Sequence, residues 1–339
     1  MMKPLYCISD DKLLCLLCPH LCRIAQERTG LCGARKNRGG KIELSTYGAV
    51  SGYGLDPVEK KPFYHWFPGY NILSVGSYGC NMRCDFCQNY HISQGVPARF
   101  GRMMSPADIV TDALEMERNT GIAFTYNEPV IWFEFMRDIA IAAKNNGLFT
   151  AMVSNGFVCE DPLEEITGFI DAFNIDLKAF NDNFYKKLAG ASLDPVKKSM
   201  KQIVKSGRHL EITTLIVPGQ NDSVGEMVYE AEWIAGELGK EIPLHLSRYF
   251  PMHKRTDRMT SDDSLLRLYD AAASKLSYVY FGNIDNNKGH DTTCPYCETI
   301  VTKRTGYNTR LMFLSNEGNC GRCGRLIYKN FKPSLPKGH

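Results

Sequence analysis

Eleven of the thirteen cysteines lie in three tight groups, and this grouping limits what the chain can fold into more than any other feature. The spacing within each group is typical of metal ligands, and only Cys7 and Cys159 stand apart. Disulfide frameworks belong to short secreted domains, whereas this chain has 339 residues and no apolar run suited to a signal peptide or membrane span. We therefore expect a cytoplasmic protein whose cysteines are reduced, metal-bound thiolates.

Between the cysteine groups, short apolar runs alternate with segments of helical periodicity, which is typical of βα units built over a parallel sheet. Six such units span only about 180 residues, fewer than a closed eight-fold barrel needs. The sequence therefore predicts an α/β fold with a partial, open (βα)6 barrel. The expected strands are Ile72–Ser77, Ile122–Tyr126, Phe149–Ser154, Ala172–Leu177, His209–Val217 and Ile242–Ser247. Ser105 and Pro106 predict a helix start, and a further helix (262–275) and strand (278–281) follow the sixth unit.

The cysteine groups and the βα pattern divide the chain into three expected segments. Residues 1–70 form a cysteine-rich metal-binding segment, residues 71–282 the barrel, and residues 283–339 a zinc-ribbon or rubredoxin-like segment. A net charge of +3 over 40 basic and 37 acidic side chains gives no clear nucleic-acid signal, and no membrane association is expected.

The central cysteine group lies directly after the first expected strand, in the run GSYGCNMRCDFCQN at residues 76–89. Cys80, Cys84 and Cys87 follow the pattern C-x3-C-x2-C, with no fourth cysteine nearby. In a [4Fe-4S] cluster each thiolate binds one iron, so three thiolates leave one iron open to an outside ligand. The alternative is a zinc site with three cysteines that His91 completes, although zinc knuckles prefer C-x2-C pairs.

The central group resembles the radical S-adenosylmethionine (SAM) enzymes. The resemblance implies that the open iron binds the amino and carboxylate groups of SAM. One electron from the cluster then cleaves the carbon–sulfur bond, giving methionine and a 5′-deoxyadenosyl radical that abstracts hydrogen from a substrate. The cofactor supplies this chemistry, while the protein positions the reactants and excludes water.

Thr125-Tyr-Asn-Glu-Pro129, after the second strand, occupies the place of the superfamily's glycine–glycine–glutamate motif but lacks both glycines. By resemblance, Glu128 binds the SAM ammonium, a role that suits a carboxylate. The alternative is a solvated cap at the start of a helix.

Three further strand ends match passages of the pyruvate formate-lyase activating enzymes: Ser154-Asn-Gly156, Asp176-Leu-Lys178 and Val217-Pro-Gly-Gln-Asn-Asp222. The resemblance implies that Lys178 faces the SAM carboxylate and that Asn155 and Asp176 donate or accept hydrogen bonds to the sugar or methionyl group. It also places the backbone at Val217 near the adenine. Each residue also suits an ordinary turn. His245 and Arg248, which end the sixth strand, are weaker candidates for the same cavity.

The two outer groups each contain four cysteines, enough to close a metal site completely. Cys15, Cys18, Cys22 and Cys32 suit either structural zinc or a second iron–sulfur cluster, and the neighbouring His20 makes a mixed zinc site conceivable. Cys294, Cys297, Cys320 and Cys323 form two C-x2-C knuckles separated by 22 residues. These knuckles predict a zinc ribbon, with rubredoxin-like iron as the alternative.

Taken together, these motifs resemble the AmmeMemoRadiSam-system radical SAM family, a relative of the pyruvate formate-lyase activating enzymes. The resemblance implies a [4Fe-4S] cluster, SAM, and a reductant such as flavodoxin or ferredoxin. The substrate is either a glycine of a glycyl-radical enzyme or another macromolecule or small molecule. A hypothesis of a different class is an iron–sulfur electron-transfer protein without turnover, in which Glu128 and Lys178 have no purpose.

Overall fold

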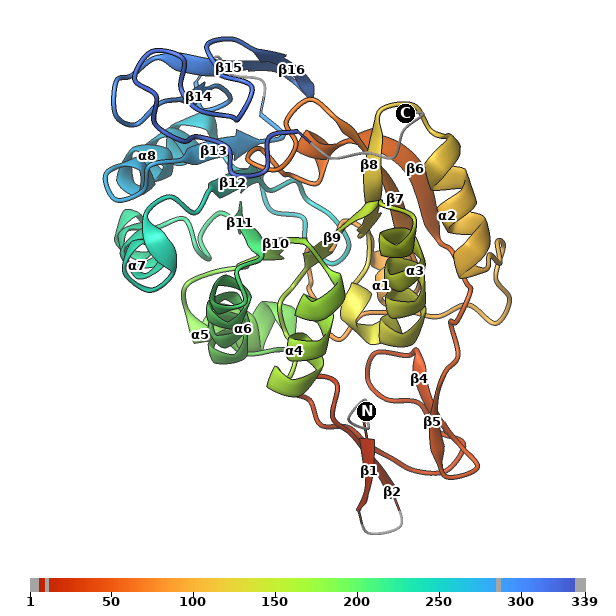
Figure 1. Cartoon of the computed structure of the whole chain (residues 1–339). Coiled ribbons are helices and arrows are strands. Elements are labelled where there is room, and N and C mark those ends of the chain that lie inside the picture. Colours follow the sequence, from red (N-terminus) through yellow and green to blue (C-terminus); the bar gives the residue numbers. More distant parts are fainter. Residues whose placement is uncertain (1–5, 10–11, 285–287, 333–339) are drawn as a thin grey trace.

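The computed structural model describes residues 6–9, 12–284 and 288–332, and its centre is an eight-stranded sheet (Figure 1). The strands from β7 to β13 run parallel in sequence order, and β6 pairs antiparallel with β7 at one edge. The strands are β6 (Gly52–Pro57), β7 (Asn71–Gly76), β8 (Asn119–Phe124), β9 (Phe149–Ser154), β10 (Ala172–Asp176), β11 (His209–Ile216), β12 (Leu244–Arg248) and β13 (Val279–Gly282).

The helices that follow the strands cover the outer face of this sheet (Figure 1). The longer ones are α2 (Pro106–Glu115), α3 (Phe133–Asn145), α4 (Glu160–Phe169), α6 (Leu193–Lys205), α7 (Val224–Ile234) and α8 (Asp262–Ala273). The shorter ones are η1 (Val58–Lys60), α1 (Tyr90–Ser93), η2 (Pro129–Trp132), α5 (Asp182–Phe184), η3 (Tyr185–Ala189) and η4 (Ala235–Gly239). The predicted start of α2 is confirmed, because Ser105 and Asp108 form a reciprocal capping box before Pro106.

The predicted partial α/β barrel is confirmed: the strands curve round in order, and the sheet has two ends, β6 and β13. All six expected strands are present, with ends shifted by up to three residues. The strand β6 was not expected, because its sequence GYGLDP is rich in glycine and proline. Pairing with β7 over its whole length, from Gly52 opposite Gly76 to Pro57 opposite Asn71, makes it a strand.

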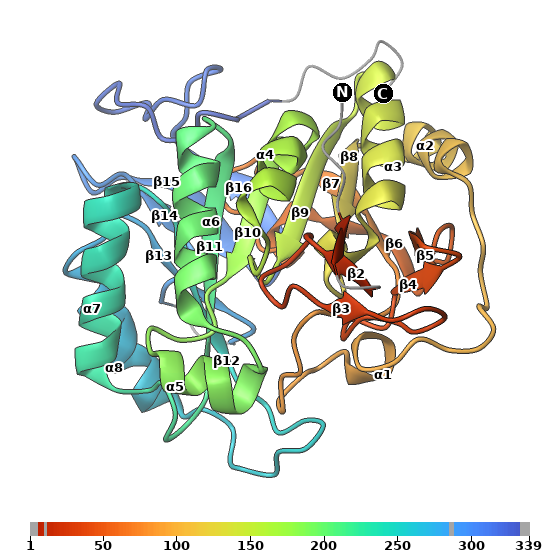
Figure 2. The same ribbon diagram turned by 90° about the horizontal axis from the view of Figure 1, so that it is seen from below.

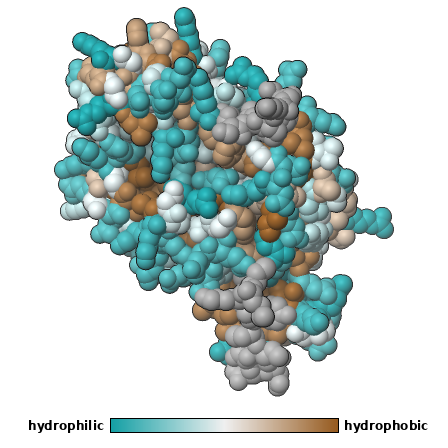
Figure 3. Space-filling model, viewed as in Figure 1, coloured by the Kyte–Doolittle hydropathy of each residue, from teal (hydrophilic) through white to brown (hydrophobic). Residues whose placement is uncertain are grey.

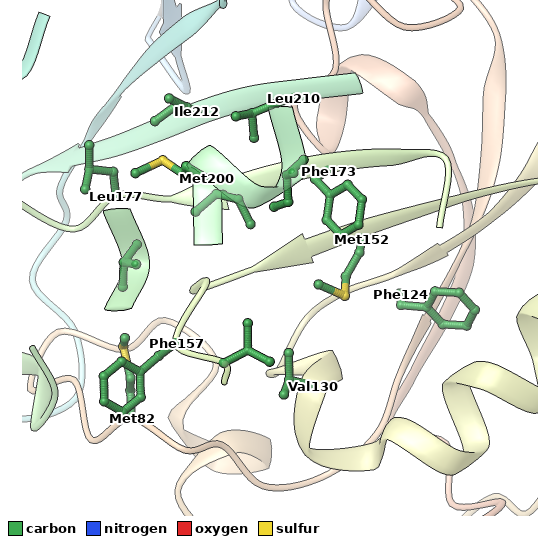
Figure 4. Close-up of a cluster of buried hydrophobic side chains, with 14 of the residues drawn as sticks. Met82, Phe124, Val130, Met152, Phe157, Phe173, Leu177, Met200, Leu210 and Ile212 are labelled. Atoms are coloured by element: carbon green, nitrogen blue, oxygen red, sulfur yellow. The ribbon is translucent and has the colours of Figure 1, made fainter. Parts of the chain in front are cut away.

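The two faces of the strands bury different kinds of side chain. Leu210, Ile212 and Ile216 of β11 belong to a large apolar cluster that also takes in the inner faces of the helices. Figure 4 shows part of this cluster. Glu211 and Thr213 alternate with them on the opposite face, inside the barrel, where they contact His245 and Asn174. The barrel interior is therefore partly polar.

The two cysteine-rich appendages lie at opposite ends of the barrel (Figures 1 and 2). The N-terminal one contains β1 (Tyr6–Ser9), β2 (Lys12–Cys15), β3 (Arg23–Ile24), β4 (Arg35–Arg38) and β5 (Lys41–Leu44). The C-terminal one is an antiparallel sheet of β14 (Thr292–Thr293), β15 (Ile300–Thr305) and β16 (Asn308–Leu311). β6 lies within residues 1–70, but it pairs with β7 in the central sheet. The division of the chain into three segments stays a prediction.

Hydrophilic residues predominate on the face shown in Figure 3, with smaller hydrophobic patches between them. Within the described part of the chain, every helix is too short or too polar to cross a bilayer.

A buried carboxyl group between β11 and α7 leads to a prediction about pH. Glu230 is 1% exposed and accepts a hydrogen bond of 2.6 Å from Thr214, and burial raises its pKa from 4.5 to about 8. The folded chain then holds a proton that the unfolded carboxyl releases, so stability falls as the pH rises from about 4.5 to about 8. We expect Glu230→Gln to remove this loss. The free energy of unfolding is measured in urea for both proteins. From pH 5 to pH 9, wild type should lose about 4 kcal/mol more of this free energy than the variant loses. The control Glu232→Gln, on the exposed side of the same helix, should change nothing, and equal pH profiles for all three proteins would contradict the prediction.

Candidate functional site

The loop after β7 carries Cys80, Cys84 and Cys87 and is fixed on both sides. Gly79 has a φ of +87°, and a Cβ there would lie 2.4 Å from the Cys32 carbonyl oxygen, so only glycine fits. Its N–H donates to the Ile92 carbonyl (2.8 Å), and its own carbonyl accepts from the Asn127 amide (2.9 Å). These contacts hold the loop between the N-terminal appendage and the end of β8.

The three thiols on this loop have surroundings that suit metal binding. Cys84 is buried and the other two are half-buried. Burial raises the pKa of Cys84 to about 12, although the Lys178 ammonium lowers it, so a bound cation is what would deprotonate this thiol at neutral pH. The Met82 N–H donates to the Cys80 sulfur (3.3 Å), and the Ser93 hydroxyl lies 3.1 Å from the Cys87 sulfur. Three thiols on one loop fit a cluster with one open iron.

His91, the alternative fourth ligand for zinc, lies on α1 and is exposed. The described contacts of its ring are with Tyr90, at a centroid distance of 5.9 Å. Within the described residues, His91 forms no close group of metal-binding atoms with the three cysteines. The geometry therefore does not favour the zinc alternative.

Glu128 is buried (2% exposed) and is held by the ends of β8 and β9. Its carboxylate accepts hydrogen bonds from the Val130 N–H (3.0 Å), the Ser154 hydroxyl (2.8 Å) and the Asn155 N–H (2.8 Å). Burial raises its pKa to about 7, while the backbone donors favour the charged form. Glu128 does cap η2, as the alternative hypothesis expected, but it is not solvated. The binding of the SAM ammonium by Glu128 stays a prediction.

Asn155 connects the end of β9 to the cysteine loop. Its amide donates to the Asn81 side-chain oxygen (2.9 Å) and lies 3.8 Å from the Cys80 sulfur. The amide of Asn81 in turn donates to the Phe157 carbonyl (2.7 Å). Amide donors of this kind hold a thiolate in place and stabilise its charge.

Asp176 and Lys178 meet at the end of β10, where the Lys178 ammonium lies 2.7 Å from the Asp176 carboxylate. Burial lowers the pKa of Lys178, but the negative charges of Asp176 and Cys84 raise it by more than burial lowers it. This amine therefore stays charged beside the cysteine loop. The predicted adenine turn is joined to the same point: Asn221 accepts from the Val217 N–H (2.7 Å) and donates to the Lys178 carbonyl (2.9 Å). The predicted SAM contacts thus lie on neighbouring strand ends.

His245 and Arg248, the weaker candidates, each have a carboxylate partner. His245 is fully buried inside the barrel, where its Nε2 lies 2.7 Å from the Glu211 carboxylate. Arg248 pairs with Asp262 at the start of α8. Both residues therefore have structural partners.

The four N-terminal cysteines line one small cavity, together with His20, Arg35 and Ile131. Cys159, which stands apart in the sequence, lies beside this group: its N–H donates to the Leu17 carbonyl (3.1 Å), and burial, followed by the charge of Cys15, raises the pKa of its thiol. Since α4 begins just after Cys159, only the packing of this helix against the appendage brings the two together.

The four C-terminal cysteines lie close enough for one metal ion. Their sulfurs are all within 4.8 Å of one another, and the pairs Cys294–Cys323 and Cys297–Cys320 are each 3.6 Å apart. Tetrahedral ligands at about 2.3 Å from a metal lie about 3.8 Å apart, so the geometry suits a single ion.

A larger cavity of about 630 Å³ lies at the other end of the barrel, near the starts of β9 and β11 and beside the C-terminal appendage. Among the described residues that line it, none is a predicted metal ligand or SAM contact. In parallel barrels, chemistry is found at the carboxyl ends of the strands, so we assign the functional site to the cysteine loop.

Comparison with known proteins shows the family of this chain. Residues 74–230 match the family model of the radical SAM superfamily. An uncharacterized protein of Methanocaldococcus jannaschii is 37% identical over 324 residues, which cover 94% of this chain and 96% of that protein. The chain belongs to the radical SAM superfamily. Its fold implies a [4Fe-4S] cluster and SAM.

More distant relatives of this radical SAM protein are activating enzymes. The pyruvate formate-lyase 1-activating enzyme of Escherichia coli is 27% identical over 162 residues, 46% of this chain and 64% of that enzyme. The benzylsuccinate synthase activating enzyme of Thauera aromatica is 25% identical over 140 residues, 40% of this chain and 42% of that enzyme. The crystal structure of a radical SAM methyltransferase from Sphaerobacter thermophilus has a TM-score of 0.50 and 15% identity, covering 65% of this chain and 68% of that one. This likeness shows the shared fold alone.

Three asparagines of this radical SAM protein were missed as site residues: Asn81, Asn127 and Asn221. Each lies within a motif that the sequence singled out: Asn81 follows Cys80, Asn127 precedes Glu128, and Asn221 lies four residues after Val217. Their side chains join the cysteine loop to β9, the loop to β8, and the β11 turn to Lys178. A buried amide that joins two strand ends gives no periodic signal, so its role depends on the tertiary structure.

Proposed function

We propose that this protein cleaves SAM reductively and uses the resulting 5′-deoxyadenosyl radical to abstract hydrogen from a substrate. The observation that carries the proposal is the meeting of three elements at neighbouring strand ends. These are the loop with the three thiols, the buried carboxylate of Glu128 and the charged pair of Asp176 and Lys178.

In this proposal Cys80, Cys84 and Cys87 hold a [4Fe-4S] cluster, which supplies the electron that breaks the carbon–sulfur bond of SAM. Glu128, already oriented by its three donors, attracts the SAM ammonium. Lys178 pairs with the SAM carboxylate, and Asp176 keeps the Lys178 ammonium in position. Asn155 donates to the thiolate of Cys80 and to Asn81, which keeps the cluster ligand oriented. The backbone at Val217 lies along the adenine.

The test is anaerobic reconstitution with iron and sulfide, reduction with dithionite, and assay of SAM cleavage. We expect 5′-deoxyadenosine and methionine in equal amounts, and a change in the electron paramagnetic resonance (EPR) spectrum of the reduced cluster when SAM is added. A full cluster that neither binds SAM nor releases 5′-deoxyadenosine would rule the proposal out. It would favour a protein that only transfers electrons.

A narrower candidate is the activation of a glycyl-radical enzyme with flavodoxin or ferredoxin as reductant. It is favoured by the similarity to activating enzymes, although these matches cover less than half of this chain. A glycyl-radical doublet in the EPR spectrum of a candidate partner, dependent on this protein and SAM, would support it. We also propose zinc for the C-terminal site and a cytoplasmic location.

A charge change at Lys178 should separate SAM binding from cluster binding. We expect Lys178→Met to weaken SAM binding about tenfold, because it removes a charge-assisted hydrogen bond worth roughly 1.5 kcal/mol. The iron content should not change. The matched control Lys186→Met removes an exposed lysine of η3 that pairs with Asp182 of α5, and the affinity of this variant for SAM should equal that of wild type. Unchanged SAM affinity in Lys178→Met would contradict the predicted role.

A further inference from the structure

The N-terminal cysteines form a site that is built around a cavity. Cys15, Cys18 and Cys32 are each less than 10% exposed, and Cys22 is half-buried. All four line the same cavity, and they come from β2, from the turn that follows it and from the loop before β4. Four thiols that surround one buried cavity can enclose a metal centre on all sides.

The arrangement of these thiols differs from that of the C-terminal group. The four C-terminal sulfurs lie within 4.8 Å of one another, as ligands of a single ion do. The four N-terminal cysteines line a cavity instead. A cluster binds each thiolate to a different iron and needs room between the sulfurs. Four thiols around a cavity therefore favour a cluster.

Arg35 gives a second, independent indication of a ligand in this cavity. It is 1% exposed, and two of its guanidinium nitrogens donate to the Glu134 carboxylate at 2.8 Å each. The Nε atom is buried and has no hydrogen-bond partner among the residues that the structure describes. Buried N–H groups are almost always paired, and a cluster sulfur or thiolate beside Arg35 would accept from this one.

His20 lines the same cavity, and its Nε2 lies 2.7 Å from the Asn81 carbonyl oxygen. This contact occupies Nε2 and leaves Nδ1 as the one ring nitrogen that a mixed zinc site could use. The four thiols alone are enough for a closed cluster.

The N-terminal site is packed directly on the loop that carries Cys80. The Cys32 carbonyl lies against Gly79, the residue before Cys80, and the Arg83 guanidinium donates to the Leu31 carbonyl. The contact between His20 and Asn81 forms a third connection. The first two contacts start from Cys32 and its neighbour, and His20 lies two residues from both Cys18 and Cys22. The two cysteine groups are therefore joined by direct contacts between their loops.

We infer that Cys15, Cys18, Cys22 and Cys32 hold a second, closed iron–sulfur cluster that passes electrons to the centre at Cys80, Cys84 and Cys87. A low-potential one-electron donor such as flavodoxin or ferredoxin reduces the outer cluster. That cluster returns to its oxidised state when it reduces the inner one. The same single electron breaks the carbon–sulfur bond of SAM, giving methionine and the 5′-deoxyadenosyl radical. The relay rests on the proposed function, whereas the presence of the second cluster does not.

The first test is metal analysis of the triple variant Cys80→Ala, Cys84→Ala, Cys87→Ala, which leaves the N-terminal ligands intact. Wild type should contain about eight irons per chain in cubane clusters, and the variant about four irons with four sulfides. The variant should still show the EPR signal of a reduced cluster. A variant that contains zinc in place of iron and sulfide at the N-terminal site would overturn the inference. The metal analysis does not involve SAM. It therefore tests the second cluster even if the protein fails to cleave SAM.

The second test measures the coupling. In fully reduced wild type, two paramagnetic clusters this close should broaden each other's EPR signals. The broadening should be lost in the triple variant and in Cys15→Ala, Cys18→Ala, and the latter should retain four irons at the inner site. A wild-type spectrum equal to the sum of the two single-cluster spectra would overturn the relay. Cys159→Ala, a cysteine beside the group that does not line the cavity, is the matched control and should keep both clusters and the broadening.

Discussion

Replacing Cys80, Cys84 and Cys87 by alanine together is expected to abolish SAM cleavage, lowering the rate of 5′-deoxyadenosine release by at least about a thousandfold. The three thiols lie on one loop, and no other described cysteine lies on it. Without them no open iron is available to bind SAM or to deliver the electron. The rate is measured on reduced, reconstituted protein by chromatography of the nucleoside product.

The matched control for this variant is Cys159→Ala, which removes a half-buried cysteine outside the three groups. It should release 5′-deoxyadenosine at the wild-type rate. If the triple variant kept its activity, the catalytic cluster would have to lie at one of the outer groups.

Glu211→Ala is expected to destabilise the fold by about 5 kcal/mol or more, because this buried carboxylate has four partners. It accepts from the Tyr64 N–H (2.9 Å) and the His65 N–H (2.7 Å), and it contacts the rings of His209 (2.9 Å) and His245 (2.7 Å). Alanine leaves two backbone donors and two histidines without this acceptor in the barrel interior. The free energy of unfolding is measured in urea at pH 7.

Two variants make this result specific. Glu237→Ala removes an exposed carboxylate that pairs with Lys201, and it should cost less than about 1 kcal/mol. Glu211→Gln keeps one acceptor and should fall between the two. A loss below about 2 kcal/mol in Glu211→Ala would show that the segment at Tyr64 and His65 is held by its aromatic contacts instead.

The strands that the sequence predicted correctly are those with continuous apolar runs. β9 was predicted to the residue, and β7 and β8 to within three, because strands buried on both faces need apolar side chains throughout. β6 was missed, since its glycines and proline carry no such pattern and its hydrogen bonds come from β7. The residues of β6 and their near neighbours in the sequence do not by themselves determine that strand.

The candidate site divides in the same way. The cysteine groups and the motifs around Glu128, Asn155 and Lys178 could be predicted from the sequence, because the spacing and type of these residues reflect the chemistry of the group that they bind. The burial of Glu128 and the hydrogen bonds that it accepts from the end of β9 could not be predicted from the sequence, because they depend on the distance between two strand ends.

The sequence by itself determined three cysteine groups, a parallel βα core and the order of the motifs along it, since each depends on neighbours within a few residues. Only the tertiary structure decided that the N-terminal group lies against the Cys80 loop, that its sulfurs surround a cavity with Arg35, and that Cys159 lies beside it. The physical reason is that these contacts join segments separated by tens of residues or more, whose distance is fixed when the barrel and its appendage pack together.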